Sequence, residues 1–434
     1  MILKYELKKV FSKKMNRIVL IAALLAAVVL SVFAIGSVRY VGEDGAEHTG
    51  LTASRHLAAD RNRWAGELTG DKIAQVVSSR KEIRLKYPDD VPNEIYGKTI
   101  QSYNDIENFV IGVLTLDAVW DTSVLYQLED EQVKNLYGIY ENNLQEMAKK
   151  YGETPEQQRF LTEQYETTDL PLAYEAKDSW DTIVMYVETY GMILAIVIGF
   201  LAAGIFAEEF RSRVDAVFFS SRYGRTKAVK NKVMAGLLMT TIVYWVGMGI
   251  MSLISLGVMG ISGFFTPYQI DEPYSIYAMT YGQYYLLAVL CGYIASLLAA
   301  SVTMLVAAKM RSANVAVCVP FFLFCVMPFI GRAFSTFLTF FKLTPDMLLN
   351  VIECAKNPNI FQIGNYVFRQ IPCIMLLYFI ISIILLPFAY RSYHRYGLKN
   401  KGILSCHRFC AGLKKSLRHG KRGIWKLLDS NRNH

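Results

Sequence analysis

The sequence predicts an all-α integral membrane protein with six transmembrane helices and a mainly helical extracellular domain inserted between the first two. Three observations support this fold class. Hydrophobic residues make up 53% of the 434 residues, and they gather into six runs that each reach the roughly 20 residues needed to cross a bilayer. One long polar segment, residues 39–182, separates the first two runs. Basic and acidic residues sort into alternate loops, as the positive-inside rule requires.

The first element is a basic segment, residues 1–16. Lysines lie opposite an apolar stripe formed by Ile2, Leu3, Leu7, Val10 and Phe11. This pattern is typical of an amphipathic helix in the headgroup plane of the membrane, although a plain positive flank would also fit. Residues 17–38 form the first apolar run. The run exceeds the 7–15 apolar residues of a signal-peptide core, so we expect an uncleaved membrane anchor.

The polar segment, residues 39–182, is predicted to be a mainly helical extracellular domain. Thr154, Pro155 and Gln157 have the spacing of an N-cap, a first-turn proline and a capping-box partner. An apolar stripe that we interpret as core follows helical spacing at Val124, Leu128, Val133, Leu136, Ile139, Tyr140, Leu144 and Met147. The segment contains no cysteine, which excludes a disulfide scaffold.

The second half of the chain holds the other spans. The second is predicted at residues 183–207, and residues 233–331 contain three more, at 233–263, 275–308 and 313–331. Residues 332–370 are neither polar enough for a free loop nor apolar enough to cross. We expect two short extracellular amphipathic helices there, broken at Pro345 and at 357–358, because irregular backbone at membrane depth needs protein or water around it. The sixth span is predicted at 371–390, and residues 391–434 form a basic tail.

The charges predict the topology. Residues 1–17 hold six basic residues and one acid, residues 208–232 hold seven and three, and the tail holds twelve and one. Residues 39–180 hold 15 basic and 26 acidic residues. We therefore expect both termini in the cytoplasm and the polar domain outside. For the tail, contact with anionic membrane lipid is favoured over nucleic-acid binding.

Several kinds of chemistry find no support in the sequence. The chain lacks the G-x-x-x-x-G-K-[ST] loop that binds nucleotide phosphates. The only charged residues near predicted membrane depth are Glu188 and Arg332, and all six histidines lie outside it, whereas proton- or ion-driven transport should show more. Cys406, His407 and Cys410 form a weak metal motif that we interpret as a chance cluster. We expect no catalytic residue and no metal ligand.

Residues 208–232 form the longest internal basic loop and are predicted to be a cytoplasmic coupling loop. Glu208 and Glu209 are interpreted as the start of a helix, where carboxylates complement the positive end of the dipole. Its apolar face is expected at Phe210, Val214, Val217 and Phe218, and Gly224 is expected to end it. Such a helix can seat in a groove on a cytosolic partner. It can also simply lie at the membrane interface.

The sequence resembles the membrane-spanning permease subunits of ABC transporters of the type-2 exporter class. The resemblance covers nearly the whole chain and rests on "LKYELKKVFSKK", "YEAKDSWDTIVMY" and, most specifically, "IFAEEFRSRVDAVFFSSRYGRTKAVKNKV". It implies a bacterial plasma-membrane protein that pairs with a second copy or a paralogue and docks a cytosolic ATPase. ATP and Mg²⁺ would be bound by that partner, with no cofactor in this chain. The implied coupling residues are Glu208, Glu209, Phe210, Arg211, Val214, Asp215, Phe218, Phe219, Arg222, Gly224 and Arg225.

The resemblance implies an exporter subunit. A dry pathway lined by Met, Phe, Tyr and small residues would be compatible with an amphipathic substrate, which could be a peptide, a lipid or a drug-like molecule. The alternative is a membrane-anchored sensor or scaffold with a ligand-binding extracellular domain. A membrane enzyme is the third possibility, disfavoured because no buried set of acid, base and metal-binding residues is predicted.

Overall fold

The computed structural model describes residues 2–116, 121–333 and 341–396, with the backbone alone at 331–333. Within these ranges, six helices are long and apolar enough to cross a membrane. They are α2 (Lys14–Ser37), α11 (Asp178–Arg211), α13 (Val229–Met259) with the preceding π-helical turn η3 (Gly224–Ala228), α14 (Tyr281–Met310), the continuous run of α15 (Ala313–Phe321), η5 (Phe322–Val326) and α16 (Met327–Ala333), and α19 (Gln370–His394). The protein is therefore a mostly helical, multi-pass membrane protein.

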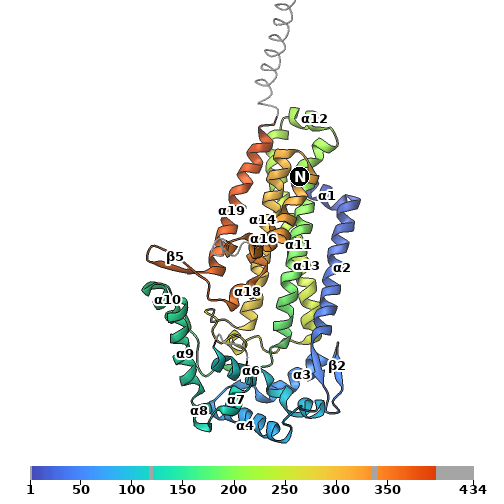
Figure 1. The fold of residues 1–434 in the computed structure, drawn as a ribbon. Helices are drawn as coiled ribbons and strands as arrows, with labels where there is room; N and C mark the ends of the chain where they lie inside the picture. The colour runs from blue at the N-terminus through green and yellow to red at the C-terminus, as the bar shows by residue number, and fades with distance from the viewer. Residues whose placement is uncertain (1, 117–120, 334–340, 397–434) are drawn as a thin grey trace, which may run out of the picture.

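The spans pack lengthwise into one bundle (Figure 1). The helices α11 and α14 form its centre, with 67% of the most apolar stretch of each buried, whereas the corresponding stretches of the α15 run and α19 are only 17% and 22% buried. The predicted spans are all present, but their ends differ. The helix α11 extends beyond both predicted ends. The helix α14 begins at Tyr281 rather than at residue 275, because Thr280 and Gln283 form a capping box there.

The polar domain, residues 38–177, lies at one end of the bundle, and α1 (Ile2–Ser12) and α12 (Asp215–Ser220) lie at the other (Figure 1). We call these the polar-domain end and the α12 end. The helical elements of the domain are α3 (Ala53–Arg61), η1 (Asn62–Trp64), α4 (Gly70–Lys86), α5 (Asn93–Ile95), η2 (Tyr96–Ile100), α6 (Gln101–Thr115), α7 (Val124–Gln127), α8 (Asp130–Lys134), α9 (Leu136–Tyr151) and α10 (Pro155–Tyr165). Two small antiparallel pairs join them, β1 (Arg39–Val41) with β2 (Glu47–Thr49) and β3 (Gly66–Glu67) with β4 (Ala173–Tyr174).

The predicted start of α10 is confirmed, because the Thr154 side chain accepts a hydrogen bond from the Gln157 amide at 3.2 Å. The apolar stripe that precedes α10 is core, but it is divided among α7, α8 and α9 rather than following one helix. The division arises at Glu129, which starts α8 with a capping box to Gln132.

A buried charge network joins the polar domain to the bundle. Arg61 contacts Asp105 at 2.5 Å and Asp178, at the start of α11, at 2.8 Å. Burial raises the pKa of Asp105, but the nearby charges of Arg61 and Lys177 outweigh it and hold that pKa below its ordinary value. Lys177 in turn pairs with Asp271, which lies between α13 and α14. The domain is thus fixed to α11 and to the connection between α13 and α14.

The segment before α19 differs from the prediction. It contains the 3-10 turn η7 (Pro345–Leu349) and α18 (Val351–Lys356), whose first turn is held by Glu188 of α11 through the Ile352 amide at 2.8 Å. The second expected helix is instead a hairpin of β5 (Ile360–Ile363) and β6 (Tyr366–Arg369). Apolar and aromatic residues flank the two-residue loop Gly364–Asn365, and Gly364 has a positive φ of 61°, which favours a hairpin turn.

Some predictions fall on parts of the chain outside the described residues. These are the section at 334–340 of the expected amphipathic helices, the Arg332 side chain, and the basic tail beyond Tyr396, which includes Cys406, His407 and Cys410. A 3-10 turn, η4 (Tyr268–Ile270), completes the described elements between α13 and α14.

Candidate functional site

The predicted coupling residues lie at the α12 end of the bundle. The helix α11 continues to Arg211, and the backbone then turns sharply at Arg213, which has a φ of 56°. The short helix α12 follows, and η3 leads into α13. Glu208 and Glu209 therefore sit in the last turn of α11 and do not begin a helix, so their predicted role as dipole partners is wrong. At the C-terminal end of a helix, carboxylates are disfavoured by the dipole, and other groups must stabilise them here.

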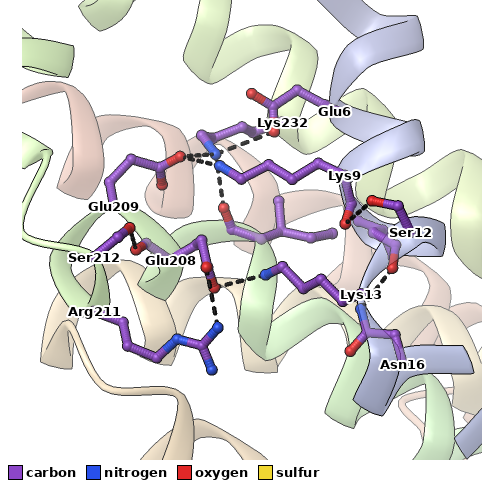
Figure 2. A network of polar contacts seen from close by, with 12 residues as sticks. Glu6, Lys9, Ser12, Lys13, Asn16, Glu208, Glu209, Arg211, Ser212 and Lys232 are labelled. Carbon is purple, nitrogen blue, oxygen red and sulfur yellow. Dashed lines mark hydrogen bonds and ion pairs between the residues drawn. The ribbon is translucent and has the colours of Figure 1, made fainter. Parts of the chain in front are cut away.

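Glu209 is held by a buried cluster of charged and polar groups (Figure 2). Its carboxylate lies 2.6 Å from the Lys9 ammonium and 2.9 Å from that of Lys232, and it accepts a hydrogen bond from the Tyr393 hydroxyl at 2.8 Å. Lys232 is fully buried and also donates to the Ile205 carbonyl at 2.8 Å. One carboxylate thus joins α1, α11, α13 and α19.

The other contacts of this cluster fix α1 against the bundle. Lys232 also pairs with Glu6 at 3.2 Å, and Glu208 pairs with Lys13 at 2.6 Å, at the joint between α1 and α2. Burial lowers the pKa of Lys9, but Glu209 outweighs that effect and holds the pKa above its ordinary value. The sequence predicts an interfacial α1 with its lysines opposite the apolar stripe. Lys4 and Lys8 are exposed, whereas Lys9, and Lys13 just after α1, point toward α11 (Figure 2).

An aromatic cluster lies beside these charges. The Phe210 ring packs against Tyr396 at a centroid distance of 5.0 Å, and Phe219 packs against Tyr393 at 5.0 Å and Tyr396 at 4.8 Å. Edge-to-face and tilted aromatic pairs of this kind add about 0.5–1.5 kcal/mol each beyond their burial. The inner side of α12 is therefore held against the end of α19 by rigid rings.

Polar contacts complete this attachment. Arg225 donates to the carbonyls of Phe219, His394 and Tyr396, at 3.0, 3.2 and 2.6 Å. The Tyr396 hydroxyl donates to Asp215 at 3.0 Å. Gly224 packs so closely that a Cβ there would lie 1.8 Å from the Phe218 carbonyl oxygen. No other residue type fits at 224 without opening the turn.

The outer side of the loop is exposed, and we call it the α12 face. Val217 is 73% exposed and Val214 is 46% exposed, although both are large apolar residues. Tyr223, at the start of η3, is 44% exposed. The exposed arginines around this face are Arg211, Arg213 and Arg222. A small apolar centre with a basic rim is typical of a protein interface.

The sequence-predicted site residues therefore divide into two groups. Those that attach the loop to the bundle are Glu208, Glu209, Phe210, Asp215, Phe218, Phe219, Gly224 and Arg225. Those exposed at the surface are Arg211, Val214 and Arg222. Of the predicted apolar face, Val217 is also exposed. Residues that the prediction did not include, and that the structure adds, are Glu6, Lys9, Lys13, Lys232, Arg311, Tyr393 and Tyr396.

A second concave region lies at the opposite end of α19. A groove of about 990 Å³ separates α19 from the β5–β6 hairpin and the turn between α9 and α10. Its apolar wall includes Leu376 and Ile380, and its polar wall includes Lys342 and Asn359. In the part of the chain that the structure describes, no three His, Cys, Asp or Glu side chains come together as metal ligands.

Comparisons with known proteins place no further constraint on the site, because no family model, no curated protein and no solved structure matches the chain.

Proposed function

We propose that this protein is the membrane-spanning subunit of an ABC transporter of the type-2 exporter class. In this proposal a separate cytosolic ATPase binds ATP and Mg²⁺ and docks on the α12 face. The observation that supports it best is the combination of an exposed apolar centre at Val214 and Val217 with a rigidly attached inner side. The resemblance of residues 206–233 to the coupling segment of that family points to the same surface.

Transmission of force needs a docking element that cannot move independently of the spans. The α12 loop meets this need, because Arg225 bonds to the end of α19, and Glu209 joins α11 to α1, α13 and α19. A displacement of α12 would therefore be passed to at least four helices. Packed interiors respond to such displacements as units rather than deforming gradually.

The charges support a cytoplasmic location for the α12 end. The loop carries seven basic residues against three acidic ones, whereas the polar domain is strongly acidic. By the positive-inside rule, the polar domain would lie outside a bacterial plasma membrane, and a cytosolic ATPase could reach α12.

The substrate that we propose is amphipathic. The groove beside α19 combines an apolar wall, at Leu376, Leu377 and Ile380, with a polar wall at Lys342 and Asn359. A peptide, a lipid or a drug-like amphiphile could occupy such a groove. As in other transporters of this class, a second copy or a paralogue would complete the pathway.

Purification from native membranes tests the ATPase partner. A tagged chain solubilised in a mild detergent should bring down a P-loop ATPase, identified by mass spectrometry. Val217→Asp places a charge at the centre of the face, and recovery of the ATPase should fall about tenfold or more, because desolvating an unpaired charge at an interface is costly. Leu85→Asp is the matched control, since Leu85 is 85% exposed on α4 of the polar domain. A sensor or scaffold would be recovered without an ATPase, and equal recovery from both variants would remove α12 from the interface.

A further inference from the structure

The α12 end also contains a pocket, which is distinct from the α12 face and from the groove beside α19. This pocket, of about 560 Å³, opens between the α1–α2 joint, the end of α11 and the turn between α14 and α15. Four basic residues line it against a single acid, Glu208. The basic residues are Lys13, Lys14, Arg211 and Arg311. The charges of the lining residues therefore sum to a net positive charge.

Ion pairs within the pocket do not neutralise all of this positive charge. Glu208 contacts Lys13 at 2.6 Å and Arg211 at 3.1 Å, so one carboxylate serves two cations (Figure 2). Within the described part of the chain, Lys14 and Arg311 have no carboxylate within ion-pair distance. Two cations that line the pocket thus lack an anionic partner among the residues that the structure describes.

Arg311 is held in place for such a partner. Its guanidinium lies 4.5 Å from the centre of the Tyr396 ring and 5.9 Å from that of Phe210, within cation–π range. Its backbone ends α14 in a left-handed conformation, with a φ of 60°. Aromatic stacking fixes the plane of a guanidinium but satisfies none of its five N–H donors, which match the geometry of a phosphate group.

The other wall of the pocket is apolar and belongs to the spans. It includes Phe200 of α11, Val317 of α15 and Met15 of α2, and Met15 is 60% exposed. In a membrane, the exposed surfaces of these helices face acyl chains. A ligand that satisfies both walls must carry an anionic head group and a hydrocarbon tail.

We propose that this pocket binds one anionic glycerophospholipid from the leaflet at the α12 end. Its phosphate would lie between Lys14 and Arg311, and its acyl chains would lie along Phe200 and Val317. A basic pocket between spans is a recognised means of head-group binding. The inference goes beyond the proposed transport function and does not depend on the ATPase partner.

Lipid binding to the purified full-length chain tests the proposal. In detergent, phosphatidylglycerol should bind more tightly than phosphatidylcholine, as measured by native mass spectrometry across a lipid titration. The double variant Lys14→Gln/Arg311→Gln should weaken phosphatidylglycerol binding about 30-fold, at about fivefold for each basic residue removed. The matched control is Lys309→Gln, which removes a neighbouring exposed charge outside the pocket and should change binding less than twofold.

Two further measurements keep the test decisive. The charge-preserving variant Lys14→Arg should retain binding, which separates loss of charge from damage to the fold. Glycerol 3-phosphate at the same concentrations should not compete, because it has no tail for the apolar wall. Equal binding of the two lipids, equal effects of the pocket and control variants, or full competition by glycerol 3-phosphate would each overturn the proposal.

Discussion

Replacing Glu209 with glutamine should destabilise the protein by about 3–5 kcal/mol, the usual cost of removing one partner of a buried ion pair. Lys232 is fully buried and would keep its charge with only Glu6, at 3.2 Å, as an anionic partner. Lys9, whose ammonium lies 2.6 Å from Glu209, would lose the same partner. The change should appear as a lower unfolding midpoint in a denaturant titration of the protein in detergent micelles.

Two controls isolate the buried charge as the cause. Glu163→Gln breaks an exposed pair with Arg159 on α10 and should cost less than about 1 kcal/mol. The double variant Glu209→Gln/Lys232→Met removes both buried charges, and it should recover a large part of the lost stability. If Glu209→Gln were no more harmful than Glu163→Gln, the cluster would not fix the α12 end.

Replacing Gly224 with alanine should open the turn between α12 and α13. A Cβ at residue 224 would lie 1.8 Å from the Phe218 carbonyl oxygen, and a backbone atom cannot move aside as a flexible side chain can. We expect a local cost of about 1–3 kcal/mol or more. Because that cost falls on the loop rather than on the spans, the fraction of open loop should rise about tenfold or more.

Limited trypsin digestion measures this opening directly, since the loop contains Arg222 and Arg225. Cleavage there should accelerate about tenfold in Gly224→Ala while the protein remains monodisperse in detergent. Gly249→Ala in α13 is the matched control, because a Cβ at residue 249 meets no atom within 4 Å. Unchanged cleavage of the Gly224 variant would show that the loop tolerates a side chain at this position.

The features of the fold that depend only on local sequence could be predicted. A membrane span is fixed by about 20 consecutive apolar residues, and all six predicted spans are present. The start of α10 was also predictable, because Thr154, Pro155 and Gln157 act within one turn of helix. The hairpin at β5–β6 carried a local signal as well, the Gly364–Asn365 turn, which the interpretation as a helix overlooked.

The arrangement of the α12 end depends on contacts between residues far apart in the chain. Glu209 and Lys9 are separated by 200 positions, so the sequence could not show that these groups meet. The pairing of Glu209 with Lys9 and Lys232 stabilises the last turn of α11 against an unfavourable dipole, and the next helix begins only at Asp215. The basic flank of α13 thus contains a buried structural lysine that composition alone assigns to the solvent or to lipid.

These contacts change the role that we assign to most of the predicted coupling residues. Most of them hold the loop in place, and a smaller exposed set around Val214 and Val217 is free to meet a partner. Substitutions at Glu209 and at Val217 should therefore differ. The first should lower the stability of the whole bundle, and the second should affect the partner alone.

Photo-crosslinking from the α12 face in intact membranes tests the proposed function most directly. A photoreactive amino acid at position 217 should form an adduct with a P-loop ATPase, and ATP with Mg²⁺ should alter the yield of that adduct. The same probe at position 85, which is as exposed but lies in the polar domain, should form none. An adduct only with lipid at position 217, or one with a protein that lacks a nucleotide-binding motif, would contradict the assignment of α12 as the site that receives work from an ATPase.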